Sequence, residues 1–395
     1  MTKKTDTPAI RFKGFSDTWE QRKLGEIGSV SMCRRIFKEQ TSENGEIPFY
    51  KIGTFGGEAD AFISRELFEE YKAKYQYPKK GDILISASGS IGRTVVFTGK
   101  NEYFQDSNIV WLNHDKHLDN SFLKCFYSIV KWAGIEGSTI KRLYNDNILN
   151  TAITLPSVEE QQKIGAYFEN LDNLITLHQR KYEKLHNIKK SMLEKMFPKN
   201  GSNVPEIRFK GFTEAWEQRK LGDCFAERVE SMPDGELISV TINDGIKKFS
   251  ELGRHDNSND DKSKYKKVCI GDIAYNSMRM WQGASGYSPY EGIVSPAYTV
   301  LSPNSGINSK CLAYQFKLPE MIHTFQINSQ GITSDNWNLK YPALSEIEIF
   351  VSRNEKEQAK IAEYFEWLDR LITLHQRELE KLQNIKKSML EKMFV

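Results

Sequence analysis

Residues 160–197 read EQQKIGAYFENLDNLITLHQRKYEKLHNIKKSMLEKMF, and residues 357–394 repeat this stretch as EQAKIAEYFEWLDRLITLHQRELEKLQNIKKSMLEKMF. Residues 159–197 and 356–394 agree at 30 of 39 positions with a constant offset of 197. Apolar residues recur at alternating spacings of three and four, and no proline interrupts either copy, which is typical of a long helix with one apolar stripe. A helix of about 38 residues is about 57 Å long. The sequence therefore predicts two long and closely similar helices.

Each apolar stripe predicts a surface on which another helix packs. We expect the two long helices to pack antiparallel within the chain, because a tandem repeat returns the chain with near two-fold symmetry. Helices of another subunit are expected on a further side. His178 and His375 occupy equivalent stripe positions and are interpreted as polar register residues, not metal ligands. The predicted helix interface comprises Phe168, Leu171, Ile175, Leu185 and Met192 in the first copy and Phe365, Leu368, Ile372, Leu382 and Met389 in the second.

A second repeated segment opens each half of the chain. Residues 10–25 read IRFKGFSDTWEQRKLG and residues 207–222 read IRFKGFTEAWEQRKLG, alike at 13 of 16 positions and again offset by 197. The chain is therefore two tandem units, each with an opening segment, a variable block and a long helix. The predicted domains are a first globular domain (1–158), a long central helix (159–198), a linker (199–205), a second globular domain (206–353) and a long C-terminal helix (354–395).

The variable blocks, residues 26–158 and 223–355, read as mixed α/β domains, so the predicted fold class is α+β with an internal pseudo-two-fold repeat. Both contain Gly-Asp-Ile at the start of a strand, at residues 81–83 and 271–273, followed by a loop rich in serine and glycine. Strands are predicted at 47–52, 82–87, 94–98, 108–112, 237–242, 272–276, 293–301 and 346–351, and helices at 65–75, 121–132 and 310–326.

The composition is that of a soluble protein with sizeable cores. Of 395 residues, 39% are hydrophobic and 27% charged, and the formal net charge is only +3. No run approaches the 18 to 20 apolar residues of a membrane span, and the first residues lack the apolar core of a signal peptide. Five cysteines without a C-x-x-C pair indicate ordinary reduced thiols and no zinc site. We expect a cytoplasmic protein.

Sequence motifs of several enzyme classes are missing. The chain has no Pro-Pro dipeptide, which the Asn/Asp-Pro-Pro-aromatic turn of amino-methyltransferases requires, and no P-loop. A nuclease motif at Pro233-Asp234-Gly235-Glu236 would need a lysine where Ile238 stands. The sequence therefore predicts no methyltransferase, nuclease or ATPase activity in this chain, no catalytic residues and no metal site.

The order and spacing of four segments resemble a known family. Each half opens with RFKGF and WEQRKLG, continues with the Gly-Asp-Ile strand and its Ser/Gly loop, and closes with a helix that begins E-Q-x-K-I and ends IKKSMLEKMF. This combination, over the whole chain, resembles the specificity subunit of type I restriction–modification systems. The resemblance implies that each block is a target recognition domain reading one half of a split double-stranded DNA target, with the long helices holding the two domains apart.

The resemblance also implies that chemistry resides on partner subunits. Modification subunits would methylate adenine with S-adenosylmethionine, and restriction subunits would translocate and cut DNA with ATP and Mg²⁺. No cofactor is therefore expected on this chain. Two other interpretations remain open. One is a coiled-coil scaffold whose two globular domains bind protein partners, and the other is an enzyme with an unrecognised site.

Base readout requires polar and cationic side chains on loops, while lysine and arginine on phosphates add affinity without sequence information. For each candidate the alternative is an ordinary solvated loop residue. For Trp281 the alternatives are stacking on a base or wedging a base step and packing under its own loop, and we expect the packing. For the pairs Lys189-Lys190 and Lys386-Lys387 the alternatives are contact with the DNA backbone and a solvated helix face, and we expect the solvated face. The candidate DNA contacts are Ser88, Ser90, Arg93, Thr94, Lys141 and Arg142 in the first domain and Asn276, Arg279, Gln282, Ser285, Asn336 and Trp337 in the second.

Overall fold

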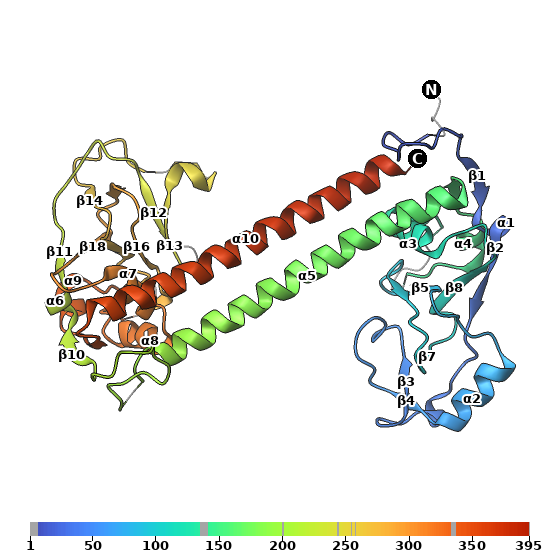
Figure 1. Cartoon of the computed structure of the whole chain (residues 1–395), viewed down its shortest axis with the longest axis horizontal. Helices are drawn as coiled ribbons and strands as arrows, with labels where there is room; N and C mark the ends of the chain where they lie inside the picture. Colours follow the sequence, from blue (N-terminus) through green and yellow to red (C-terminus); the bar gives the residue numbers. More distant parts are fainter. Residues whose placement is uncertain are drawn as a thin grey trace. The chain divides into compact units, whose positions relative to one another are not determined.

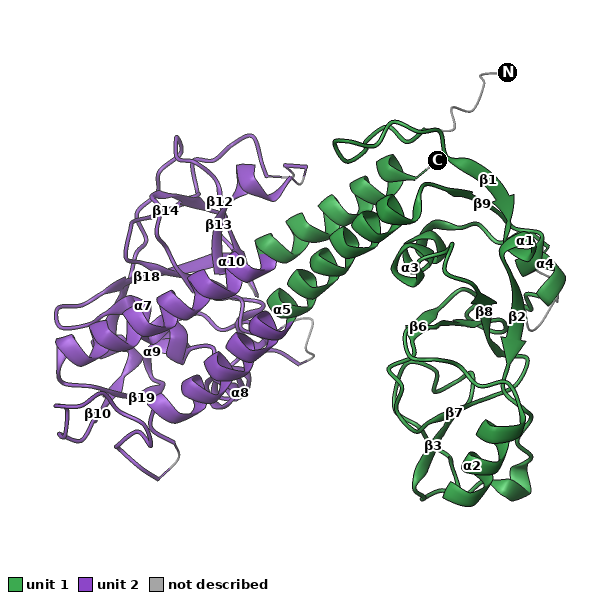
Figure 2. Cartoon of the chain, turned by 45° about the vertical axis from the view of Figure 1, so that its right-hand side comes forward, with its two compact units in different colours: residues 1–179, 377–395 green, residues 180–376 purple. Residues whose placement is uncertain are grey.

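The computed structural model describes residues 7–134, 141–199, 201–242, 245–253, 255–256, 258–332 and 337–394. The chain forms two compact units (Figure 2): unit 1 comprises residues 1–179 and 377–395, and unit 2 comprises residues 180–376. The unit boundaries fall inside the two long helices, α5 (Val158–Met196) and α10 (Glu355–Met393), so each unit contains part of both. The two predicted long helices are confirmed.

Unit 1 is built on a four-stranded antiparallel sheet in the order β2-β8-β5-β6. A smaller sheet has the order β4-β3-β7, and β1 pairs with β9. The elements (Figure 1) are β1 (Glu20–Lys23), α1 (Leu24–Ile27), β2 (Gly28–Met32), η1 (Lys38–Gln40), β3 (Ile47–Tyr50), β4 (Phe62–Ile63), α2 (Arg65–Lys74), β5 (Ile83–Ser86), β6 (Thr94–Val96), β7 (Tyr103–Phe104), β8 (Ile109–His114), α3 (Asn120–Ile129), α4 (Asn145–Leu149) and β9 (Ala152–Leu155).

Unit 2 repeats this plan with the antiparallel sheet β11-β18-β15-β16 and the pair β10 with β19, and it adds the pairs β12 with β13 and β14 with β17. Its elements are β10 (Glu217–Lys220), α6 (Leu221–Cys224), β11 (Phe225–Glu227), β12 (Ile238–Thr241), β13 (Gly245–Lys248), η2 (Phe249–Leu252), β14 (Lys266–Val268), β15 (Ile273–Asn276), η3 (Met280–Gln282), β16 (Ser285–Tyr287), β17 (Gly292–Val294), β18 (Tyr298–Pro303), α7 (Ser309–Gln315), α8 (Pro319–Ile327), α9 (Tyr341–Ser345) and β19 (Glu348–Val351).

Two predicted elements of unit 2 are wrong, and proline accompanies both errors. The single strand expected at 293–301 is two strands, β17 and β18, separated by a segment that contains Pro296. The single helix expected at 310–326 is α7 followed by α8, which begins at Pro319. Proline lacks an N–H donor and disfavours the helical conformation in the residue before it, so it ends a regular element or stands at the start of one.

The predicted correspondence between the two Gly-Asp-Ile segments is confirmed. Gly81 and Gly271 both have a φ of +97°, a conformation that glycine adopts without steric cost. Asp82 and Asp272 each accept a hydrogen bond from the backbone N–H three residues earlier, at 2.7 and 2.8 Å. In both units this turn leads into the buried strand of the main sheet, β5 or β15.

Within unit 1 the first part of α5 packs antiparallel on the last part of α10. The ring of Phe168 lies 6.3 Å from that of Phe394, just after α10. One turn further along α5, the carboxylate of Asp172 accepts a hydrogen bond from Lys386 at 2.6 Å. Advancing along α5 therefore means going back along α10, which confirms the predicted antiparallel packing for this unit.

Unit 2 shows the same packing with the roles of the helices exchanged. Phe197, just after α5, lies 6.2 Å from Phe365, and Lys189 donates a hydrogen bond to Asp369 at 2.5 Å. Lys189 and Lys386 are thus half-buried partners of aspartates on the facing helix. The solvated helix face predicted for these two lysines is wrong, because each reaches across the packed surface.

The predicted stripe residues lie along these surfaces. Phe168, Leu171, Phe365, Leu368 and Ile372 are buried, whereas Ile175, Leu185, Met192, Leu382 and Met389 are half-buried.

An arginine from each opening segment binds the glutamate that begins the E-Q-x-K-I motif of the same unit. Nε and Nη2 of Arg11 donate to the Glu160 carboxylate at 2.7 and 2.8 Å. The same atoms of Arg208 donate to Glu357 at 2.5 and 2.9 Å. Both carboxylate side chains are 0% exposed. A buried carboxylate is stable only when it is paired and hydrogen-bonded, so these bidentate pairs explain why RFKGF and E-Q-x-K-I occur together.

The glutamine of the motif joins the long helix to the start of a shorter one. Gln161 Oε1 accepts the backbone N–H of Asp119, the residue that caps α3, at 2.8 Å. Gln358 Oε1 accepts the backbone N–H of Asn308, which caps α7, also at 2.8 Å. The lysines Lys163 and Lys360 lie over the rings of Phe15 and Phe212, at 4.8 and 5.2 Å from the ring centres.

Each opening segment also binds the end of the other long helix. The backbone N–H of Ile10 donates to the carbonyl of Lys392 at 3.0 Å, and that of Ile207 donates to Lys195 at 2.9 Å. A duplicated clamp of opening segment, helix start and helix end therefore forms the base of each unit.

Candidate nucleic-acid interface

The ends of four strands meet at one edge of the main sheet of unit 1. β2 ends there at Met32, β5 ends at Ser86, β6 begins at Thr94 and β8 begins at Ile109. The strand registers place these ends together, since Ser86 pairs with Ile109 and Met32 pairs with Val110. The loop at 87–93, the segment before β8 and the segment after β2 therefore leave the sheet at the same edge, which we call the loop edge.

The loop at 87–93 is held in shape by hydrogen bonds to its own base and to a distant segment. The Ser86 hydroxyl accepts the backbone N–H of Arg93 at 2.9 Å and donates to the carbonyl of Ser90 at 2.5 Å. The backbone N–H of Leu143 donates to the carbonyl of Ala87 at 2.8 Å. These bonds bring residues 141–143 against the loop, so the two predicted groups of unit 1 lie together.

The candidate residues of unit 1 differ in exposure. Ser88 is 6% exposed and its hydroxyl donates to Asn108 Oδ1 at 2.7 Å, so this side chain does not reach a base edge in this conformation. Thr94 lies in β6 opposite Ile85. The exposed candidates are Ser90, Arg93 and Lys141.

Two arginines at this edge are positioned by neutral groups. The guanidinium of Arg93 donates to the carbonyl of Ile52 at 3.0 Å and lies 5.7 Å from the ring centre of Phe55. That of Arg142, which is half-buried, donates to the Ser107 hydroxyl at 3.0 Å. No carboxylate neutralises either arginine within the part of the chain that the structure describes. Both are positive charges held at the loop edge.

Ser107 and Asn108 also lie at the loop edge, where they bind Arg142 and Ser88, and the sequence analysis did not find them. Ser107 has a φ of +44°, a strained conformation for a residue with a side chain, and Asn108 fixes Ser88. Short polar residues are common in the turns that precede strands, so the sequence around Ser107 and Asn108 does not distinguish them from ordinary turn residues.

Unit 2 presents a loop at the corresponding edge, between the end of β15 at Asn276 and the start of β16. The backbone N–H of Leu339 donates to the carbonyl of Ser277 at 2.8 Å, the counterpart of the bond from Leu143 to Ala87. This bond brings Trp337 to the loop, where its ring lies edge-on to Trp281 with centres 5.2 Å apart. The same backbone frame thus carries different side chains in the two units.

The candidates of unit 2 also differ in exposure. Arg279 and Gln282 are exposed, and Asn276 is half-buried with its Oδ1 accepting the backbone N–H of Met278 at 3.0 Å. Ser285, the first residue of β16, is 1% exposed, so it is shielded from a ligand. Asn336 lies outside the described residues.

A lysine beneath this loop was not found from the sequence. Lys317 Nζ donates to the carbonyl of Gly283, which follows η3, at 2.7 Å, and to that of Ile242 at 3.0 Å. Burial, with a smaller contribution from Lys189, lowers its pKa to about 8. The ammonium therefore holds the base of the loop, at the cost of burying a charge.

Stability should respond to pH through Lys317. Below pH 8 this lysine is protonated in both folded and unfolded chains, and the folded state bears the full cost of the buried charge. Between pH 8 and about 10.5 the folded state loses the proton first, so that cost diminishes. Between pH 7 and 10 the free energy of unfolding of the wild type should rise by about 2 kcal/mol relative to that of Lys317→Met. Urea unfolding at a series of pH values measures this difference. Lys264→Met is the control, because Lys264 is exposed. If the free energy of unfolding changed with pH in the same way in both variants, the role assigned to Lys317 would be contradicted.

Comparisons with known proteins agree with the duplicated plan. The family model for the type I restriction modification DNA specificity domain matches twice, at residues 16–187 and 213–384, with the same offset of 197 as the repeats. A protein from Haemophilus influenzae, described as a type I restriction enzyme specificity subunit, is 60% identical over 157 residues, which are 39% of this chain and 41% of that protein.

A specificity subunit of the MjaX restriction enzyme from Methanocaldococcus jannaschii is 28% identical over 52% of each chain. These two matches thus span about half the length of the curated relatives or less. The fold is also similar to the crystal structure of the type I restriction–modification S subunit from M. genitalium, with a TM-score of 0.64, 15% identity and coverage of 98% of this chain and 99% of that one.

No helix among the described residues has the length and apolar content needed to cross a membrane. The family model covers most of the chain and coincides with both repeats. The chain therefore belongs to the family of type I restriction modification DNA specificity domains.

Proposed function

We propose that unit 1 and unit 2 each read one half of a split double-stranded DNA target through their loop edges. The observation that carries this proposal is one duplicated frame that holds unlike loops at equivalent places: residues 87–93 beside 141–143, and residues 277–284 beside 337–339. A duplicated frame suits two ligands of one class, and divergent loops suit two different sequences. B-DNA presents such half-sites on one side about 10 base pairs apart.

The side chains of the two edges suit base reading. Arg93 and Arg279 are exposed, and an arginine fork binds the O6 and N7 atoms of guanine. Gln282 offers the amide pair that matches adenine. Lys141 can neutralise a phosphate without sequence preference. We assign base readout to Arg93, Arg279 and Gln282, a phosphate contact to Lys141, and a supporting role to the buried Ser88 and Ser285.

The faces of the long helices that do not pack inside the chain suit partner subunits. Leu174 and Leu177 on α5 and Trp367 and Leu374 on α10 are exposed large apolar residues. We propose that modification subunits, which bind S-adenosylmethionine and methylate adenine, dock there. Restriction subunits would supply ATP- and Mg²⁺-dependent cleavage, and the complex would act in the cytoplasm on DNA.

Single substitutions of the two exposed arginines should affect different half-sites. Arg93→Ala should relax specificity in one half-site and Arg279→Ala in the other, each by about tenfold to hundredfold, since a good bidentate contact discriminates by about 1–3 kcal/mol. The measurement is binding of the complex with modification subunits to DNA carrying each single base-pair change. Arg22→Ala, on β1, is a control. Loss of specificity in the same half-site for both variants would contradict the assignment.

A further inference from the structure

Two exposed arginines follow β2 at the loop edge of unit 1. In the segment Cys33-Arg34-Arg35-Ile36-Phe37, Cys33 and Ile36 are buried while the other three residues are exposed. The carbonyl of Arg34 accepts a hydrogen bond from the Tyr103 hydroxyl at 3.1 Å. Because its apolar residues and its backbone are anchored in the core, this segment is fixed with both guanidinium groups in solvent.

Both guanidinium groups lie over aromatic rings. Arg34 is 5.2 Å from the ring centre of Tyr75, and Arg35 is 5.5 Å from that of Phe37. These rings are themselves exposed, Tyr75 at 43% and Phe37 at 49%. A ring orients a guanidinium plane while leaving its N–H groups available for a ligand.

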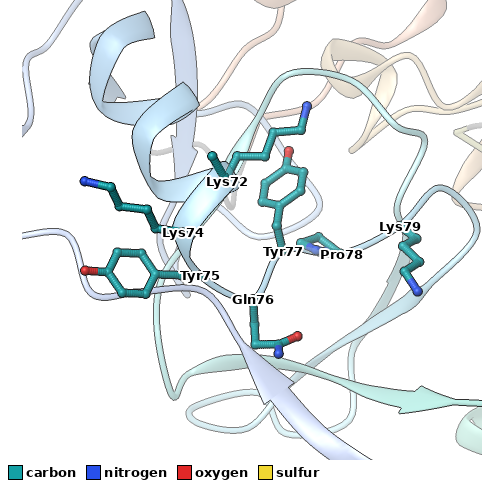
Figure 3. A pocket seen from close by; sticks show the side chains of 8 residues that line it. Lys72, Lys74, Tyr75, Gln76, Tyr77, Pro78 and Lys79 are labelled. Carbon is teal, nitrogen blue, oxygen red and sulfur yellow. The ribbon is translucent and has the colours of Figure 1, made fainter.

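The end of α2 extends this surface. Lys72, Lys74, Gln76 and Lys79 surround a shallow hollow next to Tyr75 (Figure 3). Lys72 extends over the ring of Tyr77, whose centre is 5.3 Å from Nζ. We call Arg34, Arg35, Lys72, Lys74, Tyr75 and Lys79 the α2 basic surface.

Most of this charge is not neutralised by the protein. Lys74 pairs with Glu70 at 3.0 Å, but within the described ranges no ion pair joins Arg34, Arg35, Lys72 or Lys79 to a carboxylate. By contrast, the arginines of the two opening segments, Arg11 and Arg208, are each paired with a buried glutamate. Unpaired cations on rigid supports are suited to an external anion.

Unit 2 differs at the corresponding place. The segment after β11 carries Arg228, which donates to Asp272 at 2.7 Å, and Glu230, which pairs with Lys267 at 3.0 Å. Its charges are thus neutralised inside the unit. The basic surface is a property of unit 1 and not of the shared frame.

We propose that the α2 basic surface binds backbone phosphates of the DNA beside the half-site read by unit 1. This inference rests on the proposed function. The surface adjoins the loop edge, its charge complements a polyanion, and arginine forks match phosphate oxygens. It gives unit 1 a sequence-independent contact with DNA that the described segment after β11 in unit 2 does not offer.

The test is the salt dependence of DNA binding by the complex of the full chain with its modification subunits. Each lost phosphate contact lowers the slope of log affinity against log salt by about 0.9. Arg34→Ala with Arg35→Ala should therefore lower the slope by about 2, with methylated half-sites unchanged. Arg34→Lys with Arg35→Lys should keep most of the slope, since the slope counts neutralised phosphates and lysine carries the same charge.

The matched control removes two exposed lysines outside the loop edge, Lys23→Ala at the end of β1 with Lys116→Ala after the end of β8, and should leave the slope unchanged. A slope in the alanine variant equal to that of the control overturns the inference, and so does an altered half-site, which would mean base contact. If the wild-type complex itself shows no sequence preference, the proposed function fails instead. Unchanged melting of the variant confirms that it folds.

Discussion

Replacing Glu357 by alanine should lower the free energy of unfolding of unit 2 by about 3–5 kcal/mol. This carboxylate is fully buried and accepts hydrogen bonds from Arg208, from Trp216 Nε1 at 3.2 Å and from the Ser352 hydroxyl at 2.5 Å. Its removal leaves the Arg208 guanidinium, only 12% exposed, without its counter-charge. Removing one partner from a buried pair costs much more than the pair contributes, because an uncompensated charge remains in the interior.

The measurement is urea unfolding followed by circular dichroism and tryptophan fluorescence. Because the free energy of unfolding falls by about 1–3 kcal/mol per molar urea, the urea concentration at the midpoint of unfolding should fall by at least about 1 M. Glu355→Ala is the control, since Glu355 is an exposed acid in the same first turn of α10 and should contribute less than about 1 kcal/mol. Equal midpoints for the two variants would show that the clamp does not hold the unit together.

The frame of the molecule is predictable from the sequence because its signals are local or repeated. The apolar stripe that includes Phe168 and Leu171 is recognised by residues that recur every three or four positions. The offset of 197 that both repeated segments share identifies two equivalent units. The role of the motifs is less accessible. That Glu160 is the buried partner of Arg11 depends on a contact between residues 149 positions apart.

The recognition loops are only partly predictable. The Gly-Asp-Ile strands locate the loops that carry Arg93 and Arg279, but exposure depends on strand register. Ser88 and Ser285 look like loop serines and are buried. Arg34 follows β2, and the end of β2 lies at the loop edge because β2 pairs with β8. The residues next to Arg34 in the sequence therefore do not reveal that it lies near the recognition loop.

Exchange of the block between the paired strands of unit 1 should change one half of the recognised sequence. β1 and β9 are antiparallel partners, with Lys23 opposite Ala152, so the ends of the block at residues 26–151 lie side by side. A block from a family member with another target can therefore be inserted without altering the clamp. The half-site read by unit 1 should become that of the donor, because its loops come with the block.

The most direct measurement is mapping of methylated adenines across the genome of cells that express the exchanged chain with its modification subunits. We expect a split target in which one half is new, while the other half and the number of unread base pairs between them are those of the wild type. An equivalent exchange of residues 223–347 should change the opposite half. A change of both halves by one exchange would contradict the assignment of one half-site to each unit.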